Sequence, residues 1–287
     1  MENVGNIKKI AAAIAFSNRL KDVLKEVKRF KLAFNAEAHL IHIGERSIQK
    51  ESELKENLIA IGLNPEEIIV EWKDEDVLDT IIFYCDSNKI DLLILGALDK
   101  EGILKIFRGS LARQISRKAN CNVLLLLYKQ GKERKFKRLM VDTVEYPKAK
   151  AVIELAKSLT NHLKFEELFL IKEVHHPALS YSISDSTAPE TSKLKTELLD
   201  EDVSFLNTLS HEFEQDNLKV IPKTVQGKPG YAISKYAKTK KADLLIINAP
   251  EKQFGILDRL FTHDLEYVLA ELPCNTLIVK SKQEVVE

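Results

Sequence analysis

Short runs of consecutive apolar residues alternate along the chain with longer segments in which apolar residues recur every three or four positions. The first run, IAAAIAF at residues 10–16, is typical of a strand buried on both faces in the middle of a parallel sheet. Residues 20–30 then carry five apolar side chains at helical spacing, with charged residues between them. Ser17 and Asn18 lie between the two segments and offer N-cap side chains. The pattern predicts a strand that leads into an amphipathic helix.

The same alternation continues through the first half of the chain. It predicts strands at 39–43 and 67–72, helices at 51–61 and 76–87, and a further strand from residue 91. Residues 91–127 then form an apolar run, a loop punctuated by glycines, a helix that opens at Gly109 and Ser110, and a second apolar run. Because right-handed crossovers between parallel strands account for this alternation, we expect a doubly wound α/β fold.

The stretch at 91–127 recurs in altered form at residues 243–279. Four pairs of residues keep one register: Asp91 with Asp243 and Gly96 with Asn248 at an offset of 152, and Gly102 with Gly255 and Cys121 with Cys274 at an offset of 153. A repeat of this length predicts two domains, at residues 1–130 and 136–287, with the basic connector KQGKERK at 129–135 between them.

The second half repeats the pattern with a longer insert at residues 175–215. Strands are expected at 138–143, 166–174 and 219–226, and helices at 147–163, 194–215 and 231–240. Residues 175–191 are rich in Ser, Pro and Thr, so we expect either a functional lid or a mobile loop there. The apolar stripe of the 194–215 helix is wide enough either to pack on the second sheet or to shape a pocket under that loop.

Composition and charge narrow the function classes. The 43 basic and 43 acidic residues cancel, so no net field draws the protein toward nucleic acid or a membrane surface. No apolar run approaches about 18 residues, and the N-terminus lacks an apolar core of signal-peptide length. Cys85, Cys121 and Cys274 are odd in number and have no CxxC spacing, which favours a reducing compartment. We therefore expect a cytoplasmic protein that binds neither nucleic acid nor membranes.

Three features together carry a resemblance to a known family. They are the buried first strand, the phrase KPGYAISKYAKTKKADLLII at 228–247, and G-x12-G-S from Gly96 to Ser110 followed by a helix and CNVLLL. In this combination the chain resembles a tandem member of the universal stress protein family. The resemblance implies two five-stranded parallel sheets of order 3-2-1-4-5, of the adenine nucleotide alpha hydrolase-like type. It also implies that the two domains pair through their last strands, as in a homodimer fused into one chain.

The resemblance also implies a candidate nucleotide site in the first domain. ATP-binding members carry G-x2-G-x9-G-S/T after the fourth strand, where small residues and a helix N-terminus approach the phosphates. Asp99 stands where the second glycine belongs, and Ala15 stands where the family tends to place an Asp that contacts the nucleoside. The site implied for ATP or AMP, with Mg²⁺, comprises seven residues: Ala15, Ser17, Gly96, Asp99, Gly102, Gly109 and Ser110.

The second domain departs further from this motif. Its three glycine positions hold Asn248, Glu251 and Thr262, and its Ser/Thr position holds His263. Gly255 corresponds to a loop glycine outside the core motif. Val144 takes the position of the first-strand Asp, while Asp142 lies about two residues early. We therefore expect a degenerate nucleotide cradle, more so in the second domain than in the first.

Catalytic and metal-binding interpretations find less support. His175, His176 and His211 invite a metal site, but adjacent histidines point apart in a strand and His211 has no histidine at i+4. Duplication of a buried residue explains Cys121 and Cys274 better than a redox pair does. Ser110 has neither a nearby base nor a G-x-S-x-G context. We expect no catalytic residue and no metal ligand.

Two other groups of residues have simple structural interpretations. His39 and His42 lie at odd separation on one strand, so we expect them on opposite faces of the sheet in packing roles. The basic run at 132–138 has no interleaved aromatic residues, which favours a solvated linker over a nucleic-acid site.

These patterns predict a non-enzymatic, cytoplasmic stress-response protein that serves as a binding or interaction module. The alternative is an ATP or AMP sensor, or a slow ATPase, that uses the first domain only. An electron-transfer subunit with bound flavin rests on fold analogy alone. The expected partners are the other domain of the same chain, a second copy through exposed last strands, and a protein or small ligand that the sequence does not name.

Asp99→Gly tests the degenerate cradle. A carboxylate about 6 Å from a phosphate, at an effective dielectric near 20, costs on the order of 3 kcal/mol. Removing it is therefore expected to strengthen ATP binding by roughly a hundredfold in calorimetry. Unchanged affinity would mean that Asp99 points away from the site.

Overall fold

The computed structural model divides the chain into two compact units. It describes residues 5–97, 111–127, 136–143, 149–174, 188–249, 265, 267–269 and 272–280. The first unit consists of Met1–Glu133, Glu154–Leu163 and Asn275–Glu287, and the second of Arg134–Ile153 and Lys164–Cys274. Each unit contains its own set of parallel strands.

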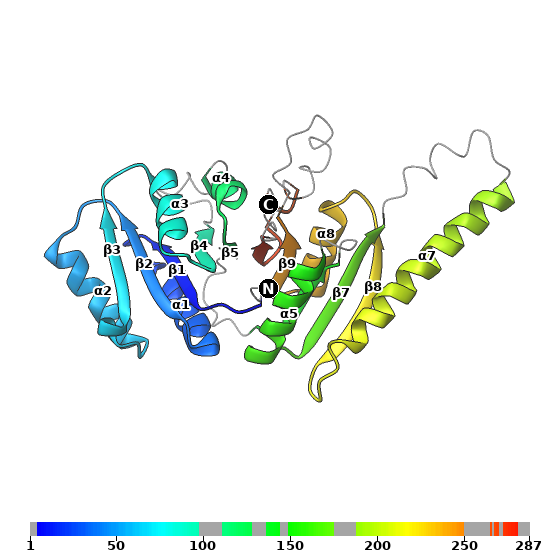
Figure 1. The fold of residues 1–287 in the computed structure, drawn as a ribbon, viewed down its shortest axis with the longest axis horizontal. Coiled ribbons are helices and arrows are strands. Elements are labelled where there is room, and N and C mark those ends of the chain that lie inside the picture. Colours follow the sequence, from blue (N-terminus) through cyan, green and yellow to red (C-terminus); the bar gives the residue numbers. More distant parts are fainter. Residues whose placement is uncertain are drawn as a thin grey trace, which may run out of the picture. The chain divides into compact units, whose positions relative to one another are not determined.

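The first unit alternates strands and helices (Figure 1). Its elements are β1 (Lys9–Ile14), α1 (Leu20–Phe34), β2 (Glu37–Ile43), α2 (Ile48–Ala60), β3 (Ile68–Lys73), α3 (Val77–Ser87), β4 (Leu92–Ala97), α4 (Leu111–Lys118) and β5 (Asn122–Leu127), with a short 3-10 turn at Pro65–Glu67 before β3. Neighbouring strands pair in parallel in the order β3-β2-β1-β4-β5. The α/β class and the parallel sheet expected from the sequence are confirmed.

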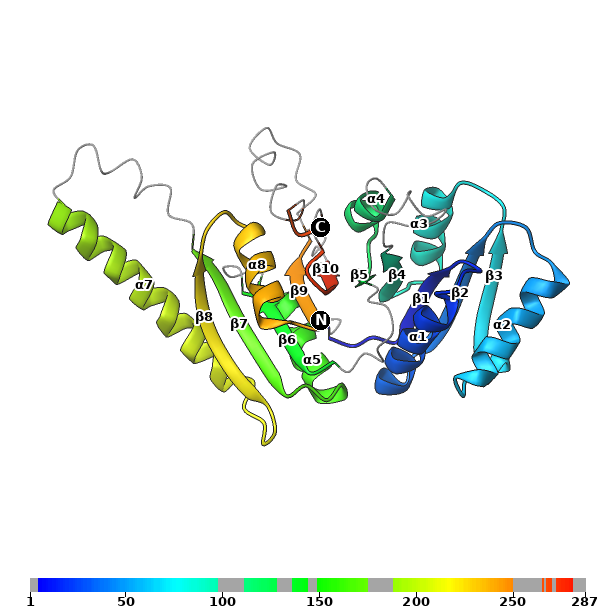
Figure 2. The same ribbon diagram turned by 180° about the vertical axis from the view of Figure 1, so that it is seen from behind.

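Helices cover both faces of this sheet. α1 packs against α2, and α3 packs against α4. Figures 1 and 2, which view the molecule from opposite sides, place the first pair on one face and the second pair on the other. Right-handed crossovers require this arrangement, because the chain moves outward from β1 to β3 and then returns to β4.

Local sequence explains where the helices begin and end. The Ser47 hydroxyl accepts a hydrogen bond from the Lys50 N–H at the start of α2, and Asp76 accepts one from the Asp79 N–H at the start of α3. α1 starts at Leu20 with Arg19 as its N-cap, not at the expected Ser17 and Asn18.

One strand from the end of the chain belongs to the first unit. β10 (Asn275–Val279) pairs antiparallel with β5, with Leu277 opposite Leu124. Asn275 Oδ1 accepts a hydrogen bond from the Leu127 N–H at 2.9 Å, and Asn122 Oδ1 accepts one from the Lys280 N–H at 3.0 Å. The last strands of the two repeats are thus joined by a reciprocal pair of asparagines.

This pairing corrects one expectation about oligomers. β5 is hydrogen-bonded to β4 on one side and to β10 on the other. It has no free edge, so a second copy of the chain cannot add to the sheet at β5 as the sequence led us to expect.

The second unit has the same parallel arrangement in its described strands. Its elements are β6 (Arg138–Asp142), β7 (Glu167–Val174), α7 (Ala188–His211), β8 (Lys219–Gln226), α8 (Tyr231–Lys240) and β9 (Leu244–Asn248). α5 (Ala149–His162) contributes residues to both units. The strand order is β9-β6-β7-β8, and α7 packs along β7 and β8 (Figure 2).

The long helix differs from its expected bounds. α7 begins at Ala188, six positions before the expected start, and ends at His211 instead of residue 215. Pro189 lies in the first turn of α7, where proline is tolerated although it breaks a helix elsewhere. The rest of the expected irregular segment, residues 175–187, lies outside the described residues.

The repeat anchors Asp91 and Asp243 make the same contacts in the two units. Asp91 Oδ2 accepts hydrogen bonds from the N–H groups of Lys8 and Lys9 at 2.9 and 3.0 Å. Asp243 Oδ2 accepts them from Lys137 and Arg138, both at 2.9 Å. Each carboxylate therefore ties the start of the fourth strand of its repeat to the start of the first.

The cysteines have packing roles, as expected. Cys85, Cys121 and Cys274 are reduced and buried. The thiols of Cys85 and Cys121 are hydrogen-bonded, and this contact together with burial raises the pKa of Cys85 well above its ordinary range.

Within the described ranges, none of the helices combines the length and apolar character that a membrane span requires.

Asp91→Ala tests the carboxylate contact. It leaves two backbone N–H groups without their acceptor, so we expect the free energy of unfolding in urea to fall by about 1–2 kcal/mol. Asp74→Ala is the matched control, because Asp74 is exposed, and it should change stability by less than about 0.5 kcal/mol. Equal losses in the two variants would contradict the role given to Asp91.

Candidate functional site

The strand order places a candidate site at the carboxyl ends of β1 and β4. In an open α/β sheet, ligands bind where the strand order reverses, outside the carboxyl ends of the strands. In the first unit that point lies between β1 and β4, which pair in register from Ile10 and Leu92 to Ala13 and Leu95. Ala15 and Gly96 both lie just beyond the last of these pairs.

Three of the seven expected site residues are described, and the structure brings them to this edge. Ala15 and Ser17 follow β1, while Gly96 is the penultimate residue of β4 and pairs with Leu126. The other four, Asp99, Gly102, Gly109 and Ser110, lie outside the described residues.

Ala15 and Ser17 form the turn that leads into α1. The Ala15 carbonyl accepts a hydrogen bond from the Ser17 N–H at 3.0 Å, and the Ser17 carbonyl accepts one from the Leu20 N–H at 3.0 Å. Ser17 Oγ accepts a longer bond from the Arg19 N–H at 3.4 Å. The methyl group of Ala15 offers no hydrogen bond to a nucleoside hydroxyl, so the contact made by an Asp at this position is missing.

An aromatic cluster that the sequence analysis did not predict lies at the same edge. Phe16, His42 and Trp72 come from the ends of β1, β2 and β3, and their rings pack on one another. Phe16 and Trp72 are stacked with centroids 5.8 Å apart, and His42 meets both edge-on, at 4.8 Å from Phe16 and 5.0 Å from Trp72. We call these three residues the aromatic cluster.

His42 is the buried polar member of the aromatic cluster. In the sheet, His42 pairs with Ile14 of β1 and with Trp72 of β3, and it is 6% exposed. Nδ1 lies 3.2 Å from the Ile14 carbonyl oxygen, so it is the nitrogen that donates. Nε2 is buried without a hydrogen-bond partner among the described residues.

Burial lowers the pKa of His42 below its ordinary value of 6.5. The Ile14 carbonyl opposes this shift, and the positive charge of Lys50 adds to it. The Lys50 ammonium lies 5.9 Å from the centroid of Phe16 and donates to the Glu45 carbonyl at 2.6 Å. His42 is therefore a neutral imidazole inside the cluster near pH 7.

His39 lies on the opposite face of β2, as its odd spacing from His42 predicts. Its Nδ1 is 2.8 Å from the Tyr84 hydroxyl of α3, and its Nε2 is 2.7 Å from Glu37 Oε1. The hydrogen bond from His39 is the main cause of the lowered pKa of Glu37. Both nitrogens of His39 are satisfied inside the protein, which confirms a packing role.

At the equivalent edge of the second unit, Thr143 makes internal contacts, whereas Asn248 Nδ2 is buried without a hydrogen-bond partner among the described residues. Thr143 follows β6 and is fully buried, and both its N–H and its hydroxyl donate to the Ile171 carbonyl, at 2.7 and 2.9 Å. Asn248 ends β9 where Gly96 stands in the first repeat. The other positions compared with the motif, Val144, Glu251, Gly255, Thr262 and His263, lie outside the described residues.

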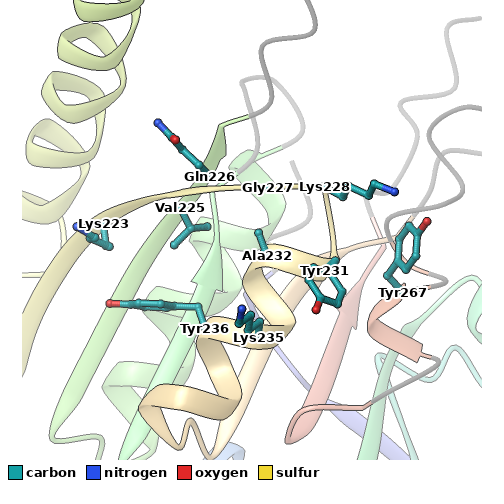
Figure 3. Close-up of a pocket in the computed structure, with 10 residues that line it drawn as sticks. All are labelled: Lys223, Val225, Gln226, Gly227, Lys228, Tyr231, Ala232, Lys235, Tyr236 and Tyr267. Atoms are coloured by element: carbon teal, nitrogen blue, oxygen red, sulfur yellow. The ribbon is translucent and has the colours of Figure 1, made fainter. Parts of the chain in front are cut away.

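Other expected or discarded candidates do not converge on this edge. His211 is exposed on α7 and contacts Glu214 at 2.7 Å, while His175 and His176 are outside the described residues. In the part of the chain that the structure describes, no three His, Cys, Asp or Glu side chains are grouped to hold a metal ion. A separate pocket in the second unit contains none of the expected site residues (Figure 3).

The architecture and comparisons identify the family. Two sets of parallel strands that alternate with helices define a tandem α/β protein. The model of the Universal stress protein family matches residues 45–126 and 135–280. The chain belongs to the universal stress protein family and is a tandem member of it.

Solved structures share this fold along almost the whole chain. One is a universal stress protein from Archaeoglobus fulgidus DSM 4304, with a TM-score of 0.65, 14% identity, and coverage of 96% of this chain and 97% of that chain. Another is a functionally unknown protein from Pseudomonas aeruginosa PAO1, with a TM-score of 0.64, 17% identity, and coverage of 96% and 93%. A comparison with curated proteins returned no match.

The titration of His42 tests its environment. Because its folded pKa is lowered, the unfolded chain binds the proton more readily, and the contribution of His42 to stability is lost as pH falls below about 6.5. His42→Asn keeps a donor near the Ile14 carbonyl but does not titrate. We expect the free energy of unfolding to drop less between pH 7 and pH 5 in this variant than in the parent. Identical pH dependence would show that His42 is not held neutral by the fold.

Proposed function

We propose that this protein is a non-enzymatic binding or interaction module of the cytoplasmic stress response whose nucleotide site is weak or lost. The observation that carries the proposal is the carboxyl edge of β1. There Ala15 offers no polar side chain, and the adjoining aromatic cluster is packed on itself. Membership of the family supports the stress-response role. The lack of a polar side chain at Ala15 supports weak or lost nucleotide binding.

The size of the expected loss supports weak binding. A carboxylate that accepts a hydrogen bond from a ribose hydroxyl contributes roughly 1.5–3 kcal/mol, and Ala15 lacks it. A carboxylate at Asp99 near the phosphates costs on the order of 3 kcal/mol more. If the two effects add, a micromolar site becomes millimolar or weaker, because those affinities differ by about 4 kcal/mol.

The same edge offers little for catalysis. His42 is the one imidazole in the aromatic cluster, and its acceptor nitrogen Nε2 is buried beside Gly44, where an added Cβ would lie 3.4 Å from it. A general base must come within hydrogen-bond reach of the proton that it removes. A covered nitrogen cannot do so without rearrangement of the cluster, which favours a protein that is not an enzyme.

One observation favours a second candidate, an ATP or AMP sensor or slow ATPase in the first domain. Gly96, the penultimate residue of β4, has no side chain, and α4 begins at Leu111, directly after Gly109 and Ser110 in the sequence. The N–H groups at the start of a helix suit a phosphate, with or without Mg²⁺. For this candidate function, those N–H groups must compensate for the hydrogen bond that Ala15 cannot make and for the repulsion expected between Asp99 and the phosphates.

Calorimetry with ATP and Mg²⁺ on the full chain separates the two candidates. We expect no saturable heat at nucleotide concentrations up to about 100 μM, which lies well below a millimolar Kd. The matched variant Ala15→Asp with Asp99→Gly restores both missing groups and should gain measurable affinity. A micromolar Kd for the parent chain, or nucleotide in an acid extract of the freshly purified protein, would contradict the proposal and favour the sensor.

A further inference from the structure

The second unit contains a pocket of about 760 Å³ between the end of β8 and α8 (Figure 3). This volume lies within the range typical of small-molecule sites, about 300–1,000 Å³. The strand order reverses at β6 and β9, whereas the pocket lies at β8, two strands from β6. Nine of the ten described lining residues lie on β8, on the turn after it or on α8, and Tyr267 comes from the segment after β9.

The side chains that line the pocket are basic and aromatic. Lysines come from β8, from the turn after it and from α8, namely Lys223, Lys228 and Lys235, and they are joined by the rings of Tyr231, Tyr236 and Tyr267. Among the lining residues that the structure describes, none carries a carboxylate. Figure 3 shows Lys228 extending toward Tyr267, and Lys235 between Tyr231 and Tyr236. Positive charge and aromatic surface thus occur together within a neutral protein.

The aromatic surface of the pocket is partly uncovered. Tyr231 is 49% exposed and Tyr267 is 42% exposed, although large aromatic side chains are usually well buried. Between the lysines, Val225 and Ala232 give the pocket an apolar floor. A flat ring of a ligand would cover this floor and stack against a tyrosine, in the offset or edge-to-face arrangements that aromatic pairs prefer.

The start of α8 is already occupied by a charge of the protein itself. Glu173 accepts hydrogen bonds from the Gly230 N–H at 2.7 Å and from the Ile233 N–H at 2.8 Å. These contacts satisfy N–H groups that would otherwise attract an anion. An anion in the pocket would therefore be held by the lysine side chains and not by the helix N-terminus.

The backbone around the pocket is held in place. Gly227 has φ of 152°, and a Cβ there would lie 3.0 Å from the Cβ of Ala232, so the turn packs directly on α8. Glu173 ties the other end of the same turn to β7. A preformed site lowers the ordering cost of binding.

We infer that this pocket binds a small aromatic anion, meaning a flat ring that carries a phosphate, sulfonate or carboxylate group. The lysines attract the anionic group, and the tyrosines and the apolar floor cover the ring. The phrase KPGYAISKYAKTKK at residues 228–241 supplies most of these side chains. The same stretch carries part of the family resemblance, and none of the seven residues expected at the nucleotide site belongs to it.

A fluorescence titration with 1-naphthyl phosphate tests the inference on the full chain. We expect saturable binding with a Kd below about 1 mM. Neutral 1-naphthol, which lacks the anionic group, and inorganic phosphate, which lacks the ring, should each bind at least tenfold more weakly. The inference is overturned if 1-naphthyl phosphate does not bind, or if either comparison compound binds equally well.

Two double variants test whether 1-naphthyl phosphate binds in this pocket. Lys228→Ala with Lys235→Ala should weaken 1-naphthyl phosphate binding at least tenfold, and both side chains are exposed, so the fold should survive. The control is Lys164→Ala with Lys219→Ala, which removes the same charge from exposed positions of the second unit outside the pocket. The control should change the Kd less than twofold. Equal weakening in the two double variants would assign the effect to overall charge and would overturn the inference.

Discussion

The first strand of each repeat is held between two parallel neighbours, and the rest of the structure depends on this constraint. β1 lies between β2 and β4, and β6 lies between β7 and β9. A strand in this position must be apolar on both faces and must satisfy its backbone groups through its neighbours. The two ends of this strand have different roles. The amino end fixes its register against the fourth strand of the repeat, and the carboxyl end faces the place where a ligand would bind.

The two ends have diverged to different extents between the repeats. At the amino end, Asp91 and Asp243 make the same pair of bonds to the start of the first strand. At the carboxyl end, the first repeat has Ala15 and the aromatic cluster, whereas the second has the buried Thr143 bonded to Ile171. The contacts that hold the fold are therefore duplicated, whereas the described residues at the carboxyl ends differ between the repeats.

Much of the fold follows from local pattern alone. The apolar run at 10–16 needs no tertiary information to be recognised as a buried strand, and the register between the repeats singled out Asp91 and Asp243. The role of these two residues was not predictable, since it depends on the first and fourth strands lying side by side. The start of α7 is harder to predict, because a proline such as Pro189 is tolerated in the first turn of a helix but breaks its interior.

The site was less predictable than the fold, for a physical reason. Phe16, His42 and Trp72 are separated by 26 and 30 positions in the sequence. These three residues meet only because parallel strands bring their carboxyl ends to one edge of the sheet. No local sequence pattern indicates such a contact. The pocket in the second unit was hidden in the same way, because Tyr267 reaches it from a segment distant from the 228–241 phrase in the sequence.

The scaffold is present in both repeats, and we propose that its nucleotide cradle has not persisted. The most direct measurement is an experimental structure of protein that was purified and crystallised without added nucleotide. We expect no nucleotide density beside Gly96 at the carboxyl ends of β1 and β4. A nucleotide retained there through purification would contradict it.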